Sequence, residues 1–222
     1  MRFSQASPAS LSGPSRYTAR DLSCESLLQD TRHLKVQSLD LFLLETLRAW
    51  HAPWLDIVMS TATIMGSMGG IWQLLALIGL THPRWRAGAW RTLLAVWLAL
   101  VVVDGLAKPL INRARPIVPP AVERTLPPAS RSASFPSGHA TSAFAGAAAV
   151  SRMWPATRVL WWALAVLIAY SRIYMGHHYP LDVIGGAIVG TAIAFWVLGG
   201  RHPATYASTL PKPLPAGMIV RP

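Results

Sequence analysis

Long apolar stretches almost free of charge constrain this chain more than any other feature. Between Leu55 and Ala107 the sequence has five charged residues, and between His139 and Gly200 it has four. The runs between them approach the roughly 20 residues that a helix needs to cross a bilayer. With 52% hydrophobic and 13% charged residues over 222 positions, the composition is too apolar for a soluble domain of this size. The pattern predicts an all-α, polytopic transmembrane helical bundle.

The apolar pattern divides into five candidate spans, at residues 55–80, 93–107, 139–153, 159–175 and 181–198. The first is expected to break near Gly66, Gly69 and Gly70. The third is short, but its many Ala and Gly residues let neighbouring helices approach closely, so we expect it at the centre of the bundle. A further crossing by residues 39–54 would raise the count to six.

The segment 39–50 carries too many charges to cross a bilayer comfortably. Its Leu41, Leu44 and Leu47 share one helical face, with Asp40 elsewhere, which predicts an amphipathic helix in the membrane interface. We therefore expect three regions: a disordered basic tail at 1–37, a membrane-embedded domain at 38–200 and a Pro-rich tail at 201–222. The first tail has no apolar stretch or cleavage site typical of a signal peptide.

Charge and cysteine content narrow the function classes. A single cysteine, Cys24, argues against an internal disulfide framework and against multi-cysteine metal sites. The net charge of +11 comes from basic residues dispersed between apolar runs, a pattern that fits loops facing lipid headgroups better than nucleic acid. We expect the lipid bilayer as the partner, with no nucleic acid and no protein partner.

Basic residues in short loops predict the orientation. By the positive-inside rule, short loops rich in Lys and Arg lie on the cytoplasmic side. We therefore expect a cytoplasmic location for the loops that hold Arg84, Arg86, Arg91, Arg152, Arg158 and Arg201. The loop after residue 107 is also basic, although the alternation of spans places it on the opposite face. Its charges therefore need another role. The expected location is a bacterial plasma membrane, with the opposite, extracytoplasmic face carrying that second set of charges.

Three polar clusters interrupt the apolar pattern, at residues 108–116, 135–140 and 171–182. Lys108 ends the second candidate span, His139 opens the third, Arg172 lies near the end of the fourth and Asp182 opens the fifth. Because successive spans alternate in direction, these four positions fall on one membrane face. The sequence therefore predicts one polar site.

The residue types in that site suit a phosphate ester. Arg115 and Arg172 can hold phosphate oxygens through paired hydrogen bonds, and Lys108 adds a compact positive charge. Ser137 and Gly138 stand where the third span begins, so backbone N–H groups there can face an anion. These residues are the candidate phosphate-binding set.

Two histidines are candidates for the chemistry. His178 and Asp182 are four residues apart, so the carboxylate can bind one ring nitrogen and leave the other free to attack phosphorus. His139, from another span, would protonate the leaving oxygen. His177 has no such carboxylate partner and is interpreted as supporting at best.

The three motifs, Lys-x6-Arg-Pro from Lys108, Pro-Ser-Gly-His ending at His139, and Ser-Arg-x5-His-x3-Asp ending at Asp182, occur in order. Together they resemble the signature of the type 2 phosphatidic acid phosphatase and haloperoxidase superfamily. The resemblance implies phosphate ligands at Lys108, Arg115, Ser137, Gly138 and Arg172, a general acid at His139, and a phosphohistidine-forming pair at His178 and Asp182. It also implies hydrolysis of a lipid phosphate or diphosphate without a metal or another cofactor.

Alternatives remain open from the sequence. The same intermediate passed to another lipid phosphate would make a phosphotransferase; a haloperoxidase branch holds vanadate at the histidine; a lipid transporter would bind headgroups without chemistry. Undecaprenyl diphosphate, phosphatidate and phosphatidylglycerol phosphate all present the required phosphoryl group. Outside the motifs, Asp104 is interpreted as a local partner of Lys108, and Arg113, Arg124 and Arg131 as residues of a mobile loop or contacts to headgroups.

Overall fold

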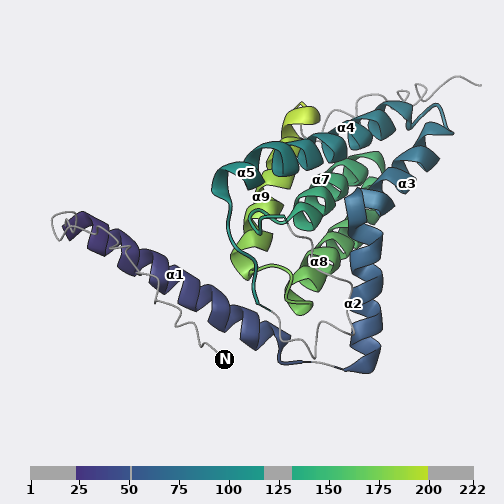
Figure 1. The fold of residues 1–222 in the computed structure, drawn as a ribbon. Coiled ribbons are helices and arrows are strands. Elements are labelled where there is room, and N and C mark those ends of the chain that lie inside the picture. The colour runs from purple at the N-terminus through teal and green to yellow at the C-terminus, as the bar shows by residue number, and fades with distance from the viewer. Residues whose placement is uncertain (1–23, 51, 118–131, 200–222) are drawn as a thin grey trace, which may run out of the picture. The chain divides into compact units, whose positions relative to one another are not determined.

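The computed structural model describes residues 24–50, 52–117 and 132–199, with side chains from residue 35 onward. Within these ranges every regular element is a helix, which confirms the all-α prediction (Figure 1). The elements are α1 (Cys24–Arg48), α2 (Pro53–Gly66), η1 (Ser67–Gly69), α3 (Gly70–Leu80), α4 (Arg86–Val102), η2 (Val103–Ala107), α5 (Lys108–Ile111), α7 (Gly138–Met153), η3 (Pro155–Thr157), α8 (Arg158–Tyr174) and α9 (Pro180–Val197).

Four helical segments of the described chain are long and apolar enough to cross a membrane: 53–80, 86–111, 155–174 and 180–197. They correspond to four of the five candidate spans. The fifth candidate is α7, whose 16 residues extend about 24 Å at 1.5 Å per residue, less than the hydrocarbon core of about 30 Å. The count of five to six crossings therefore stays a prediction.

The first span is broken where its glycines predict. The short 3₁₀ turn η1 separates α2 from α3, and both Met68 and Gly69 have positive φ, at 51° and 68°. The second span is interrupted by the π-helical segment η2 before it ends in α5. Both irregular segments contribute residues to the cavity described below.

Helix α7 lies at the centre of the bundle, as its small residues predict. It packs against α4, α8 and α9, which surround it in Figure 1. The approach is close: a Cβ at Gly146 would lie 2.2 Å from the Trp72 ring, and one at Gly190 of α9 would lie 2.1 Å from the Thr141 carbonyl oxygen. The short side chains of α7 allow this packing.

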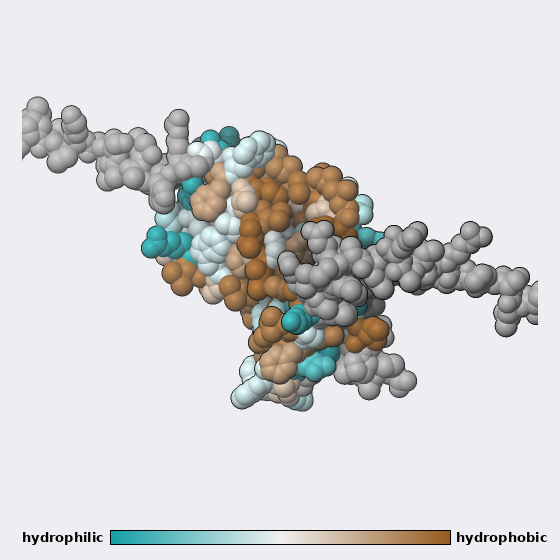
Figure 2. Space-filling model, turned by 90° about the vertical axis from the view of Figure 1, so that its left-hand side faces the viewer, coloured by the Kyte–Doolittle hydropathy of each residue, from teal (hydrophilic) through white to brown (hydrophobic). Residues whose placement is uncertain are grey.

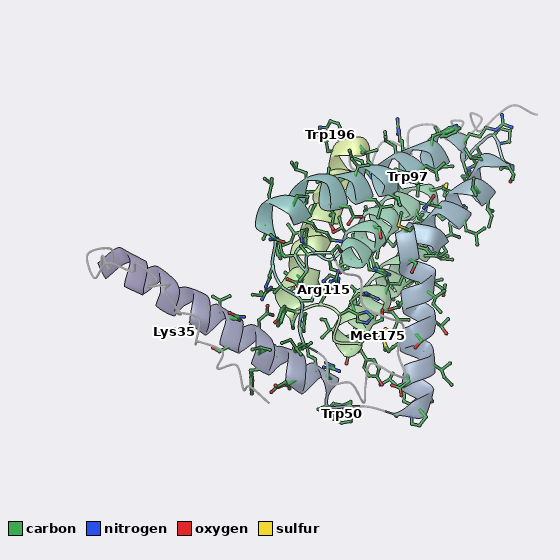
Figure 3. The ribbon with its side chains drawn as sticks, in the orientation of Figure 1. Lys35, Trp50, Trp97, Arg115, Met175 and Trp196 are labelled. Carbon is green, nitrogen blue, oxygen red and sulfur yellow. The ribbon has the colours of Figure 1, made fainter. Side chains whose placement is uncertain are left out.

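Tryptophans gather at the end of the bundle opposite the motifs. The Trp85 ring, beside the start of α4, packs edge-on against Trp154, which follows α7, at 5.5 Å between centroids, and Trp154 lies 6.0 Å from Trp161. The loops predicted to share the cytoplasmic face are thus neighbours in space. Other tryptophans point outward, such as Trp97 and Trp196, exposed by 50% and 76% (Figure 3). Hydrophobic residues also form much of the surface in Figure 2 that is not grey.

Helix α1 differs from the prediction in where it begins. It begins at Cys24, within the predicted disordered tail 1–37, in a stretch that has neither Gly nor Pro until residue 53. The chain divides after Leu39 into two units, so α1 begins in one and ends in the other. The predicted tail 201–222 and residues 1–23 lie outside the described residues.

The end of α1 buries a charged residue beside an apolar one. Asp40 and Leu44 are buried, at 0% and 3% exposure, whereas Leu41 and Leu47 are exposed. The reason is electrostatic, because Asp40 has an ion-pair partner inside the bundle. A place for α1 in the membrane interface stays a prediction.

Candidate active site

A cavity of about 580 Å³ lies where the predicted polar clusters meet. Six of the eight predicted site residues line it: Lys108, Arg115, Gly138, His139, Arg172 and His178. The alternation of span directions thus predicted their meeting correctly. The other two, Ser137 and Asp182, are fully buried next to lining residues. Apolar side chains, including Met68 and Leu100, complete the wall.

His178 lies in the turn between α8 and α9 and is 2% exposed. Its Nε2 accepts a hydrogen bond from Arg115 Nη1 at 3.1 Å. A guanidinium can only donate, so Nε2 carries the lone pair and the ring proton belongs on Nδ1. Burial lowers the pKa of His178 to about 4, so the imidazole is neutral at physiological pH.

Asp182 faces the other side of that ring. Its Oδ2 lies 3.6 Å from His178 Nδ1, longer than a hydrogen bond. The Ser134 hydroxyl donates to the same oxygen at 2.5 Å and lies 3.5 Å from His178 Nδ1. The Tyr179 backbone N–H also donates to Oδ2, at 3.0 Å, which ties the carboxylate to the start of α9.

Lys108 and Arg115 reach the cavity from the segment after η2. The Lys108 ammonium donates to Asp104 at 2.6 Å and to the Ser132 hydroxyl at 3.3 Å. The interpretation of Asp104 as a partner of Lys108 is confirmed. Arg115, labelled in Figure 3, is partly buried and donates to the carbonyl oxygens of Ser132 and His177, both at 2.8 Å. Burial lowers the pKa of Arg115, although the group stays protonated.

Arg172 is held deeper, at 5% exposure. Its Nη1 donates to the Thr63 hydroxyl at 3.3 Å, while its buried Nε has no hydrogen-bond partner among the described residues. Its carbonyl oxygen accepts from the backbone N–H groups of His177 and His178 at 3.0 and 3.3 Å, which shapes the turn that carries the nucleophile candidate. A buried donor without a partner is costly, so this guanidinium is prepared for an anion in the cavity.

The start of α7 supplies the remaining predicted residues. Ser137 caps the helix, because its hydroxyl accepts from the Ala140 N–H, and its own N–H donates to the Asp182 carbonyl oxygen at 3.0 Å. A Cβ at Gly138 would lie 3.8 Å from Lys108 Nζ, so the ammonium stands close to the helix N-terminus. His139 Nε2 lies 3.5 Å from the Ser67 hydroxyl, beside the broken first span.

Three residues of this region were not found by the sequence reasoning: Ser134, Arg113 and Asp40. Arg113 was expected at headgroups or in a mobile loop, and that interpretation is wrong. Its guanidinium donates to Asp182 Oδ1 and to Asp40 Oδ2, both at 2.6 Å. Asp40 is 73 positions from Arg113, too far in sequence for any spacing rule to link them. Arg124 and Arg131 lie outside the described residues.

Among the described side chains, no group of three or more His, Cys, Asp or Glu residues is placed to hold a metal ion. The charged groups that line the cavity are mainly cations. Such an arrangement suits an anionic ligand.

Sequence comparison finds relatives that are named as phosphatases. Undecaprenyl-diphosphatase BcrC from Bacillus subtilis is 39% identical over 101 residues, which cover 44% of this chain and 50% of that protein. Phosphatidylglycerophosphatase B from the same species is 28% identical over 177 residues, covering 74% of this chain and 84% of that protein. The chain spans about half or less of the undecaprenyl-diphosphatases that it matches.

A solved structure is similar in fold. LpxE from Aquifex aeolicus superposes with a TM-score of 0.63 at 30% identity, covering 72% of this chain and 95% of that one. With its four candidate spans, the chain is an integral membrane protein. The model of the PAP2 superfamily matches residues 88–205, more than half of the chain, and this range holds all three motifs. The chain therefore belongs to the PAP2 superfamily.

Proposed function

We propose that this chain is a membrane phosphatase that hydrolyses a lipid phosphate or diphosphate through a phosphohistidine intermediate. One observation carries the proposal: the unprotonated Nε2 of His178 stands at a cavity that Lys108, Arg115 and Arg172 also line. A neutral imidazole nitrogen is a nucleophile, and the cations attract the phosphoryl group that it attacks. The family relatives named as lipid phosphatases support the same reading.

In the first step, a phosphate oxygen accepts the hydrogen bond that Arg115 otherwise donates to His178 Nε2. Another phosphate oxygen accepts from Arg172 Nε, which has no partner among the described residues. The lone pair of Nε2 attacks phosphorus, and the bond from phosphorus to the lipid oxygen breaks. His139 gives that oxygen a proton, so the leaving group departs as the alcohol or as a protonated lipid phosphate. In the second step, water attacks phosphorus, His139 takes a proton from the water, and the P–N bond breaks to release inorganic phosphate.

Asp182 assists the first step by its effect on the imidazole ring of His178. As the bond to phosphorus forms, positive charge develops on the imidazole, and the nearby carboxylate stabilises it. Ser137 and Gly138 present the N-terminus of α7 to the phosphate, with Ser137 acting mainly by capping that helix. We propose that this chemistry needs no metal, because three side-chain cations supply the charge that phosphoryl transfer requires.

We further propose that residues 38–200 form the catalytic domain, with five or six crossings and the cavity on the extracytoplasmic face of a bacterial plasma membrane. The opposite end holds the basic short loops: Trp85, between Arg84 and Arg86, packs 5.5 Å from Trp154, which lies between Arg152 and Arg158, and this supports a cytoplasmic location for that end. Labelling of Arg84→Cys and Ile117→Cys in a Cys24→Ser background tests it. We expect an impermeant reagent to reach position 117 from outside intact cells, and labelling of position 84 instead would reverse the orientation.

The function itself is tested by phosphate release from detergent-purified protein. The substrates are undecaprenyl diphosphate, phosphatidate and phosphatidylglycerol phosphate, with and without EDTA, and His178→Ala is the inactive control. We expect phosphate from at least one lipid, unchanged by EDTA and abolished in the variant. Transfer of phosphate to a second lipid without release would identify a phosphotransferase, and binding with neither reaction would identify a transporter. Loss of activity in EDTA with rescue by Mg²⁺ would refute metal independence.

A further inference from the structure

Two buried carboxylates and a partly exposed arginine lie behind the nucleophile candidate, away from the cavity. Asp182 and Asp40 are both 0% exposed, and the single guanidinium of Arg113 lies between them with one nitrogen on each carboxylate at 2.6 Å. Neither Arg113 nor Asp40 lines the cavity. An effect of Arg113 or Asp40 on the reaction must therefore be transmitted through Asp182.

The arrangement leaves Asp182 little freedom. Arg113 binds Oδ1, while Ser134 and the Tyr179 N–H bind Oδ2, the oxygen that faces His178. The guanidinium makes one hydrogen bond to Asp182, which restrains Oδ1, and its rigid plane links that bond to the one on Asp40. Without Arg113, the carboxylate would lose the contact on the oxygen that points away from the histidine and could rotate.

Asp40 in turn holds Arg113. Its Oδ2 binds the second nitrogen of the fork, and its Oδ1 accepts from the Leu181 backbone N–H at 3.1 Å, in the first turn of α9. The Tyr179 ring lies under the guanidinium, with 4.2 Å from Arg113 Cζ to the ring centroid. Asp40 precedes the range that the family model matches, so this contact comes from a part of the chain outside the shared motifs.

We propose that Arg113 and Asp40 are positioning residues, which hold the Asp182 carboxylate toward His178 so that charge on the imidazole is stabilised during phosphoryl transfer. The inference rests on the proposed phosphatase function. It assigns a catalytic consequence to the end of helix α1, which carries no motif residue.

The test measures kcat and KM for phosphate release by Arg113→Gln, Arg113→Lys and Asp40→Asn, with Arg91→Gln as the control at an exposed arginine of α4. Residues that orient a catalytic group through a hydrogen bond typically change activity by about 10- to 100-fold. We expect Arg113→Gln to lower kcat by that factor with KM within about threefold, because the cavity lining is unchanged. Lysine should restore part of the loss, since it keeps the charge but not the fork.

Asp40→Asn keeps the shape and the acceptor for Leu181, so it should fold even if Arg113→Gln does not. We expect a smaller loss in kcat, of about three- to tenfold, again without a change in KM. The double variant Asp40→Asn with Arg113→Lys should lose less than the product of the two single losses, because both residues act through Asp182.

The outcomes separate this inference from the proposed function. If the wild-type protein releases no phosphate from any lipid, the proposed function fails. If the wild type is active and folded Arg113 and Asp40 variants keep its kcat, or lose activity through KM alone, the positioning role is wrong. Losses that multiply independently would equally overturn it.

Discussion

The neutral state of His178 predicts how the stability of the folded protein depends on pH. Burial lowers the pKa of this histidine from its ordinary 6.5 to about 4. In the unfolded chain the imidazole takes up a proton below about pH 6.5, whereas in the folded protein it stays neutral until about pH 4. Stability from this group is therefore fully present above pH 6.5 and is lost as the pH falls toward 4.

The magnitude follows from the two pKa values. One pKa unit corresponds to about 1.4 kcal/mol, so the whole difference amounts to about 3 kcal/mol, of which about 2 kcal/mol is lost by pH 5. The ring is 2% exposed, so solvent screens little of this effect. Removing the titrating group should remove that part of the pH dependence.

The assay is denaturant unfolding in detergent micelles from pH 4.5 to 7.5 for the wild type and for His178→Gln, which retains hydrogen-bonding groups. The wild type should lose about 2 kcal/mol more than the variant between pH 7 and pH 5. His82→Gln, at an exposed histidine, is the control and should follow the wild type. A pH-independent difference between the wild type and His178→Gln would refute a neutral, buried His178.

Three further predictions concern single groups. His139→Ala should lose about 100- to 10,000-fold in activity on a lipid substrate but less on p-nitrophenyl phosphate, whose phenol leaves without acid; equal losses would contradict a role as general acid. Ser134→Ala should lower kcat by about 10- to 150-fold, since a hydrogen bond to a charged group contributes about 1.5–3 kcal/mol, and an unchanged kcat would show that the contact at 2.5 Å does not serve the reaction. Gly190→Ala should lower the thermal midpoint, because its Cβ would lie 2.1 Å from the Thr141 carbonyl oxygen and overpacking costs about 1–3 kcal/mol. Gly105→Ala, with nothing within 4 Å, should not lower it.

The sequence alone determines the helical class and the meeting of the motif residues. Apolar runs of bilayer length leave the helix as the structure that pairs every backbone group within one segment. Once the spans alternate, Lys108, His139, Arg172 and His178 must share one face, and the cavity that they line follows. The break at Gly69 is also a local property, readable because glycine tolerates the positive φ that it adopts there.

Only the tertiary structure decides what lies behind those residues. The sequence pairs His178 with Asp182 by spacing, but the 3.6 Å between them and the Ser134 hydroxyl beside both depend on how the chain returns before α7. Helix periodicity indicates only that Asp40 lies off the face of Leu41, Leu44 and Leu47, and it does not reveal that Asp40 is buried. A buried carboxylate is stable when a cation reaches it, and Arg113 reaches Asp40 through a fold that no spacing rule encodes.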